Sequence, residues 1–147
     1  MRIRSYDDLV SRMRVLAELP NVRLEEIGSF EAREVWYPLF ILHVGGPAAG
    51  RMGIMLASGI HGDEPAGVEA AMRFVEMASS DPDLLSNFFF VVFPCNNPTG
   101  YELDARENWR GVDINREFNV RRPEPEARII AEALQGHCFD LVFEMHE

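Results

Sequence analysis

Hydrophobic and polar positions along the chain switch repeatedly between extended and helical patterns. The strand candidates are residues 22–27, 35–44, 52–60, 87–93 and 140–146. Ser5 and Asp8 have the spacing of a capping box, and the apolar residues after them keep helical spacing until Pro20. Pro38 lies inside the second strand candidate, which predicts an edge strand or a bulge there.

Two further helices are predicted between the later strands. Asp63 is the expected N-cap of the first, and Pro65 suits its first turn. Its predicted buried stripe consists of Val68, Ala71, Met72 and Val75. Pro125 begins the second helix, whose apolar positions are Ala127, Ile130, Ala131 and Leu134.

This alternation of strands and helices predicts an α/β fold with a mostly parallel or mixed sheet and helices on both faces. We expect residues 1–147 to form a single domain. Ligands in such sheets bind outside the carboxyl ends of the strands. Residues 61–64, the predicted long loop 96–120 and His146 all follow strands, so we expect them to meet on one rim.

Composition narrows the class of protein. The 147 residues are 47% hydrophobic and 26% charged, as in ordinary globular domains. A net charge of −10 counts against nucleic-acid binding. No apolar run is long enough for a membrane helix, and the start is not a signal peptide, so we expect a cytoplasmic protein. Cys95 and Cys138 are expected to be buried thiols.

The sharpest candidate for chemistry is the segment His61-Gly62-Asp63-Glu64. A strand ends there and a helix begins, so His61 and Glu64 can converge on one ion. His146 ends another strand of the predicted sheet and is the natural third ligand. Two histidines and a glutamate form a known catalytic zinc set. The alternative is a surface histidine beside a glutamate at a helix start.

Other residues near this segment have simpler interpretations. His43 lies in an apolar strand, so we expect it to pack there. Glu144 is two residues before His146 and is expected to support that histidine. Residues 106–118 place several arginines near the predicted rim, where guanidinium groups can bind carboxylates or stabilise an oxyanion. The alternative for this stretch is a solvated charged loop.

Four motifs in order resemble the zinc carboxypeptidase superfamily, which includes the succinylglutamate desuccinylase and aspartoacylase branch: GIHGDEPAG, NNPTG, RENWRGVDINREF and FEMHE. The resemblance covers about residues 52–147. It implies a zinc-dependent hydrolase that cleaves an amide bond next to a free carboxylate. The substrate would be a peptide C-terminus or an N-acyl amino acid, and the arginine-rich stretch favours a peptide.

The resemblance also implies a role for each matching residue. His61, Glu64 and His146 would bind Zn²⁺. Arg106 would polarise the scissile carbonyl, with Arg110 as the alternative. Asn115 and Arg116 would grip the substrate carboxylate, and Asp113 would brace their loop. The segment from Asn97 to Gly100 would be a structural turn.

The general base of this superfamily is a glutamate on a strand well beyond the third ligand. Glu147 follows His146 directly, so in a strand its side chain would point to the opposite face. We therefore expect that the base is not in this sequence, that the sequence is truncated on its C-terminal side, and that it binds metal with little or no turnover. A non-catalytic module that binds metal or carboxylate is the alternative.

Overall fold

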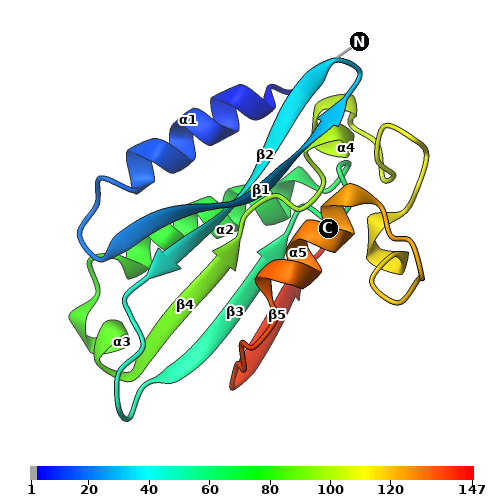
Figure 1. The fold of residues 1–147 in the computed structure, drawn as a ribbon. Coiled ribbons are helices and arrows are strands. Elements are labelled where there is room, and N and C mark those ends of the chain that lie inside the picture. Colours follow the sequence, from blue (N-terminus) through cyan, green and yellow to red (C-terminus); the bar gives the residue numbers. More distant parts are fainter. Residues whose placement is uncertain (1–2) are drawn as a thin grey trace.

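The computed structural model describes residues 3–147 (Figure 1). Its helices are α1 (Tyr6–Leu16), α2 (Pro65–Ala78), α3 (Pro82–Asn87), α4 (Pro98–Leu103) and α5 (Pro125–Ala133), with a 3-10 turn η1 (Ile114–Arg116). Its strands are β1 (Val22–Ala32), β2 (Val35–Val44), β3 (Met52–Ser58), β4 (Phe88–Phe93) and β5 (Leu141–Met145).

The strands form one mixed sheet in the order β1-β2-β4-β3-β5. β2 pairs antiparallel with β1 and β4, whereas β3 pairs parallel with β4 and β5. Helices α1 and α2 lie on one face of the sheet and α5 on the other (Figure 1). The predicted α/β fold with helices on both faces is confirmed, in its mixed rather than mostly parallel form.

The core forms between the central strands and α2. Leu42 of β2 and Val92 of β4 are opposite each other in the sheet, and both are fully buried. The predicted stripe of α2 is buried against this layer, as Val68, Ala71 and Val75 each have 0% exposure. Apolar burial of this kind is the main favourable term that holds the three central strands in place.

Several local predictions are confirmed and others are wrong. The Ser5 side chain accepts a hydrogen bond from the Asp8 N–H and caps α1 as predicted. Asp63 does not cap α2, because the N-cap is Glu64. Pro38 lies in the half of β2 that pairs only with β1, beyond the residues that pair with β4, so its missing N–H disrupts no ladder on the second side.

The segment predicted as a long loop contains two short helical elements. Asn97 caps α4 by accepting the Gly100 N–H, and Asp113 caps η1 by accepting the Asn115 N–H. The turn predicted from Asn97 to Gly100 is thus the start of a helix. A further short helix, α3, was not predicted.

The far edge of the sheet is strand β5, which has three exposed apolar residues, Leu141, Val142 and Phe143.

Cys95 is buried as expected, whereas Cys138 is exposed, which corrects the prediction for that thiol. Within residues 3–147, no helix combines the length and apolarity needed to cross a bilayer.

The close approach of the turn after β3 to α4 gives a testable prediction. A Cβ added at Gly62 would lie 1.9 Å from the Gly100 carbonyl carbon, and backbone cannot rotate away. We expect Gly62→Ala to lower the free energy of unfolding by about 1–3 kcal/mol in urea denaturation. Gly46→Ala is the matched control, because a Cβ there meets nothing within 4 Å. Equal stability of the two variants would contradict the predicted clash.

Candidate functional site

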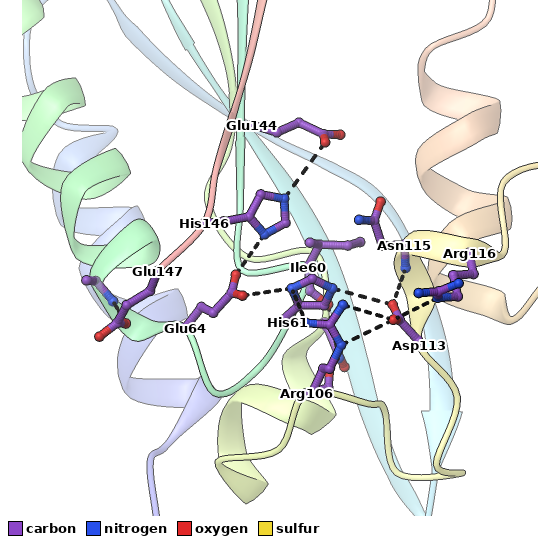
Figure 2. Close-up of polar contacts among 12 residues, drawn as sticks. Ile60, His61, Glu64, Arg106, Asp113, Asn115, Arg116, Glu144, His146 and Glu147 are labelled. Atoms are coloured by element: carbon purple, nitrogen blue, oxygen red, sulfur yellow. Dashed lines mark hydrogen bonds and ion pairs between the residues drawn. The ribbon is translucent and has the colours of Figure 1, made fainter.

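Parallel pairing of β3 with β5 brings two distant histidines together. Ser58 is paired with Met145, so the residues that follow these two strands leave the sheet at the same end. His61 follows β3 in a tight turn, Glu64 ends that turn at the start of α2, and His146 directly follows β5. Figure 2 shows the three side chains facing one another.

The three side chains meet through one carboxylate. Glu64 Oε1 lies 2.9 Å from His61 Nδ1, and Glu64 Oε2 lies 2.8 Å from His146 Nδ1. One ligand atom from each residue lies within 4.8 Å of the others, close enough to hold a metal ion. His61 is buried and Glu64 is half-buried, while His146 is more open, which leaves one side of the group accessible.

The second nitrogen of each imidazole faces a different carboxylate. His61 Nε2 lies 3.5 Å from Asp113 Oδ1, and His146 Nε2 lies 3.9 Å from Glu144 Oε2. Carboxylates in this position favour a proton on the outer nitrogen and leave the inner lone pair for a metal. His61 Nε2 is buried and has no hydrogen-bond partner within residues 3–147, so the contact with Asp113 is purely electrostatic.

This donor set suits a divalent cation. Without a metal, both Nδ1 atoms lie at hydrogen-bond distance from the Glu64 carboxylate and can donate a proton to it. A bound cation would replace these protons, and the two Nδ1 atoms and the carboxylate would then all be ligand atoms. Burial raises the pKa of Glu64, but the hydrogen bonds from His61 and His146 outweigh burial and bring the pKa below its ordinary value. Glu64 is therefore an anion at neutral pH, as a metal ligand must be.

Arg106 and Asp113 form the wall beside the histidines. Arg106 Nη1 lies 3.3 Å from His61 Nδ1, and its guanidinium donates to Asp113 Oδ2 at 3.1 Å. Arg116 Nε donates to the same oxygen at 3.3 Å. Burial raises the pKa of Asp113, but Arg106, His61 and Arg116 reverse that effect and lower the pKa. These contacts agree with the brace that was expected of Asp113.

The arginine loop, residues 106–118, thus contacts the His61–Glu64–His146 group through Asp113. Asn115 and Arg116 lie on the Asp113 side of the group in Figure 2 and are both exposed. The Asn115 N–H donates to Asp113 Oδ1 at 3.1 Å. A ligand with a negative charge can therefore approach two guanidinium groups, Arg106 and Arg116, beside the histidines. Arg110 has turned away and pairs with Glu124 instead, at 3.6 Å.

The carboxylate at the end of the chain points away from the group. Glu147 Oε2 accepts the N–H of Ala66 in the first turn of α2, at 3.1 Å. Figure 2 shows it on the opposite side of Glu64 from Asp113. This direction agrees with the alternation expected after a strand. His43 pairs with Glu25 at 2.8 Å in the outer part of the sheet, as expected of a packed histidine.

Comparison with known proteins agrees with this geometry. The family model described as zinc carboxypeptidase matches residues 10–143, which is most of the chain. The chain belongs to the zinc carboxypeptidase family. Membership implies a bound metal ion, and the His61–Glu64–His146 group is where the described residues can hold one.

Individual relatives are similar over part of their length. Carboxypeptidase M of Mus musculus is 30% identical over 151 residues, which cover 84% of this chain and 33% of that protein. Carboxypeptidase SOL1 of Arabidopsis thaliana is 27% identical over 112 residues, 62% of this chain and 23% of that protein. Murein peptide amidase A of Escherichia coli K12 is 33% identical over 87 residues, 57% of this chain and 30% of that protein. The chain spans a third or less of these relatives.

Solved structures confirm the fold. A metallo-carboxypeptidase from Burkholderia cenocepacia superposes with a TM-score of 0.82 at 22% identity, over 97% of this chain and 41% of that one. Carboxypeptidase A from Helicoverpa armigera gives 0.77 at 25% identity, over 99% and 46%. The mixed sheet with its flanking helices is therefore the carboxypeptidase fold.

Two residues that support the arginine loop were missed from the sequence. Asn108 is 3% exposed and donates to Glu124 Oε2 at 3.0 Å and to Glu126 Oε1 at 3.3 Å. Glu126 has no exposed surface, and burial raises its pKa to about 7, although Asn108 opposes that shift. The sequence signal was the Glu-Pro-Glu at the helix start, which suggested only a helix N-terminus.

The raised pKa of Glu126 predicts how stability depends on pH. The folded protein holds this proton more tightly than the unfolded chain, so the stabilisation is complete below about pH 4.5 and is lost as pH rises through about 7. Glu126→Gln keeps the neutral shape. We expect it to raise the free energy of unfolding at pH 8 by up to roughly 3 kcal/mol and to change little near pH 4.5.

The measurement is urea denaturation of both proteins at several pH values. Glu132→Gln on the same helix is the control, because Glu132 is exposed and should show no such dependence. A Glu126→Gln variant that is less stable than the parent at pH 8 would mean that the carboxylate is ionised and well solvated in the fold.

Proposed function

We propose that this chain carries the metal- and carboxylate-binding part of a zinc-dependent hydrolase that cleaves an amide bond next to a free carboxylate. The main support is the convergence of His61 and His146 on the two oxygens of Glu64, with Arg106 3.3 Å from His61. Membership of the zinc carboxypeptidase family supports the same reaction class.

Zinc is the ion that this donor set fits best. Two imidazoles and one carboxylate make a three-ligand set, and catalytic zinc sites commonly leave the fourth position open. Bound there, zinc would act as a Lewis acid toward a carbonyl oxygen and lower the pKa of water toward about 7. Asp113 and Glu144 would hold the outer imidazole protons and keep both rings oriented.

Arg106 is the residue we assign to the reacting carbonyl. Its guanidinium lies beside His61 and is held by Asp113, so its direction is set before a substrate arrives. A fixed donor of this kind stabilises the negative charge that develops on the carbonyl oxygen, typically by a few kcal/mol. Arg106 Nε and Nη2 both donate to Asp113 Oδ2, at 3.3 and 3.1 Å, so two hydrogen bonds orient the guanidinium.

Asn115 and Arg116 are the residues we assign to the free carboxylate of the substrate. The Arg116 side chain is 81% exposed, and within residues 3–147 its Nε donates to Asp113, so its two Nη groups face solvent and can bind a ligand. A guanidinium binds a carboxylate in a bidentate fork. The substrate is therefore a peptide C-terminus or an N-acyl amino acid, and similarity to carboxypeptidases and to murein peptide amidase A favours a peptide.

A binding module without turnover is the second candidate. Each carboxylate near the group in the described part of the chain already has a partner: Asp113 binds two arginines, Glu144 faces His146, and Glu147 binds the Ala66 N–H. On this view the chain binds zinc and carboxylate but hydrolyses slowly or not at all, because the described carboxylates beside the metal ligands are engaged in these contacts.

Metal content tests the proposal first. We expect elemental analysis of the purified, zinc-supplied chain to give about one zinc per chain, and His61→Ala to lose it, because two remaining ligands bind zinc far more weakly. His137→Ala is the control, since His137 is exposed and outside the group. A chain without zinc after supply would overturn the ligand assignment.

Carboxylate binding tests the role of Arg116. In the zinc-loaded chain we expect Arg116→Ala to bind hippurate about 10–100-fold more weakly, the range for loss of a charged hydrogen bond. Isothermal titration calorimetry measures both affinities. Arg128→Ala provides a matched control, because Arg128 is an exposed arginine on α5 that pairs with Glu132. Equal loss in the two variants would point to general charge attraction rather than to a site.

A further inference from the structure

The arginine loop is organised around one buried side chain, Asn108. Its Oδ1 accepts the N–H groups of Arg110 at 2.9 Å and Val112 at 3.1 Å, and its own N–H donates to the Val112 carbonyl. Its carbonyl accepts the Gly111 N–H at 2.9 Å. Asn108 therefore fixes the shape of the turn that directly precedes Asp113.

The same side chain ties the loop to α5. Asn108 Nδ2 donates to Glu124 and to Glu126, at the start of that helix. The loop is also attached by apolar packing of the fully buried Ile114 with Ile60 and Ala127. Arg110 and Glu117 add polar contacts to Glu124 at the start of α5. Apolar contacts have little directionality, so these polar contacts orient the loop on α5, and among those described for residues 3–147 the hydrogen bond from Asn108 to Glu126 is the buried one.

Glu126 makes the polar attachment sensitive to its proton. Its Oε2 is buried and lacks a hydrogen-bond partner among residues 3–147. The charged groups around it are Glu124, which shares the Asn108 amide and raises the pKa of Glu126, and Arg110, which lowers it. Glu117 adds a further negative charge, because its Oε2 accepts the Glu124 N–H at 3.1 Å.

Ionisation of Glu126 would leave a buried negative charge beside two other carboxylates. Such a charge is costly unless water reaches it. Ionisation would strengthen the one hydrogen bond from Asn108, but burial has the larger effect on Glu126, and its Oε2 has no donor among residues 3–147. The arginine loop contacts Glu126 through Asn108, so a movement of the loop away from α5 lets water reach the carboxylate. The neutral acid carries no such cost and lets the loop stay attached.

We propose that Asn108 and Glu126 are positioning residues for the arginine loop. Loss of the proton from Glu126 loosens the contact between the loop and α5, and the loop then binds a substrate carboxylate more weakly. The loosening of the loop rests on the contacts and the burial of Glu126. The effect on carboxylate binding rests on the proposed function of Arg116 and Asn115.

Tryptophan fluorescence tests the loosening without any substrate or metal. Trp109 lies in the loop next to Asn108, and its backbone N–H donates to Thr99 Oγ1 at 3.1 Å. Trp36 is 65% exposed on β2, so Trp36→Phe leaves Trp109 as the single reporter. In this background we expect Trp109 emission to shift to the red with one midpoint near pH 7, and we expect Glu126→Gln to abolish the transition.

A neighbouring variant sharpens the assignment. Glu124→Gln removes the charge that raises the pKa of Glu126, so its midpoint should move to lower pH. The absence of any transition in the parent would overturn the proposal. A transition that persists unchanged in Glu126→Gln would also overturn it, because a histidine would then be responsible.

Asn108→Ala tests the amide itself. It removes the donor to Glu124 and Glu126 and the acceptor of the Arg110 and Val112 N–H groups, so we expect the red-shifted emission of the loosened loop already below the pH midpoint of the parent. Far-UV circular dichroism shows whether the variant keeps its fold. Parent-like emission from folded Asn108→Ala below that midpoint would overturn the role of Asn108.

Hippurate binding to the zinc-loaded chain tests the coupling. We expect about 10-fold weaker binding at pH 8.5 than at pH 6 in the parent, and a smaller change in Glu126→Gln. Equal pH dependence in the two proteins would overturn the coupling. If hippurate binds at neither pH while the fluorescence transition is present, the proposed carboxylate site at Asn115 and Arg116 is wrong. In that case the positioning role of Asn108 and Glu126 is still supported.

Discussion

The parallel pairing of β3 with β5 is the constraint on which the metal group depends, because it is what brings His146 to His61. The register of this pairing is fixed at both ends. At the start, the Asp140 N–H donates to the Gly53 carbonyl and the Asp140 side chain accepts the Gly53 N–H. At the end, Glu147 accepts the Ala66 N–H of α2. A slip by one residue would turn His146 to the other face. The exposed strand β5 is thus held by specific polar contacts more than by burial.

Charged side chains around His61, Glu64 and His146 are arranged so that few of them lack a partner among the described residues. The chain has a net charge of −10, yet three of its arginines, Arg106, Arg110 and Arg116, lie in the loop beside the histidines. Asp113 holds Arg106 and Arg116 together and faces His61, so one carboxylate sets the direction of three positively polarised groups. Without Asp113, the two guanidinium groups would repel each other and the outer nitrogen of His61 would face no acceptor. The electrostatics of the metal group and of the arginine loop are therefore one system.

Residues close to strand ends were predictable from the sequence, since the rim of an α/β sheet follows from the order of strands and helices. That reasoning brought His61, Glu64 and His146 together, and the buried stripe of α2 followed from helical periodicity. Asp63 was misassigned because the helix begins one residue later, with Glu64 at the N-cap, and the Glu64 side chain contacts the histidines and makes no cap hydrogen bond. Helix α4 is too short to show a periodic pattern. The contact of Asn108 with Glu126 depends on how loop and helix pack, which no local pattern encodes.

The arginine loop combines two kinds of attachment that fail under different conditions. Ile114 anchors it by apolar burial, which is insensitive to pH and fixes its distance from the sheet. Asn108 anchors it by directional hydrogen bonds, whose strength depends on the protonation of Glu126. If the polar anchor loosens while the apolar one holds, the loop pivots about Ile114 and stays folded. Asp113 lies between Asn108 and Ile114, so it shifts with the loosened turn, and its hydrogen bonds from the Asn115 N–H and the Arg116 guanidinium shift with it. The buried acid Glu126 lowers the stability of the protein above neutral pH. The pivot of the loop about Ile114 gives a physical reason why such an acid is useful.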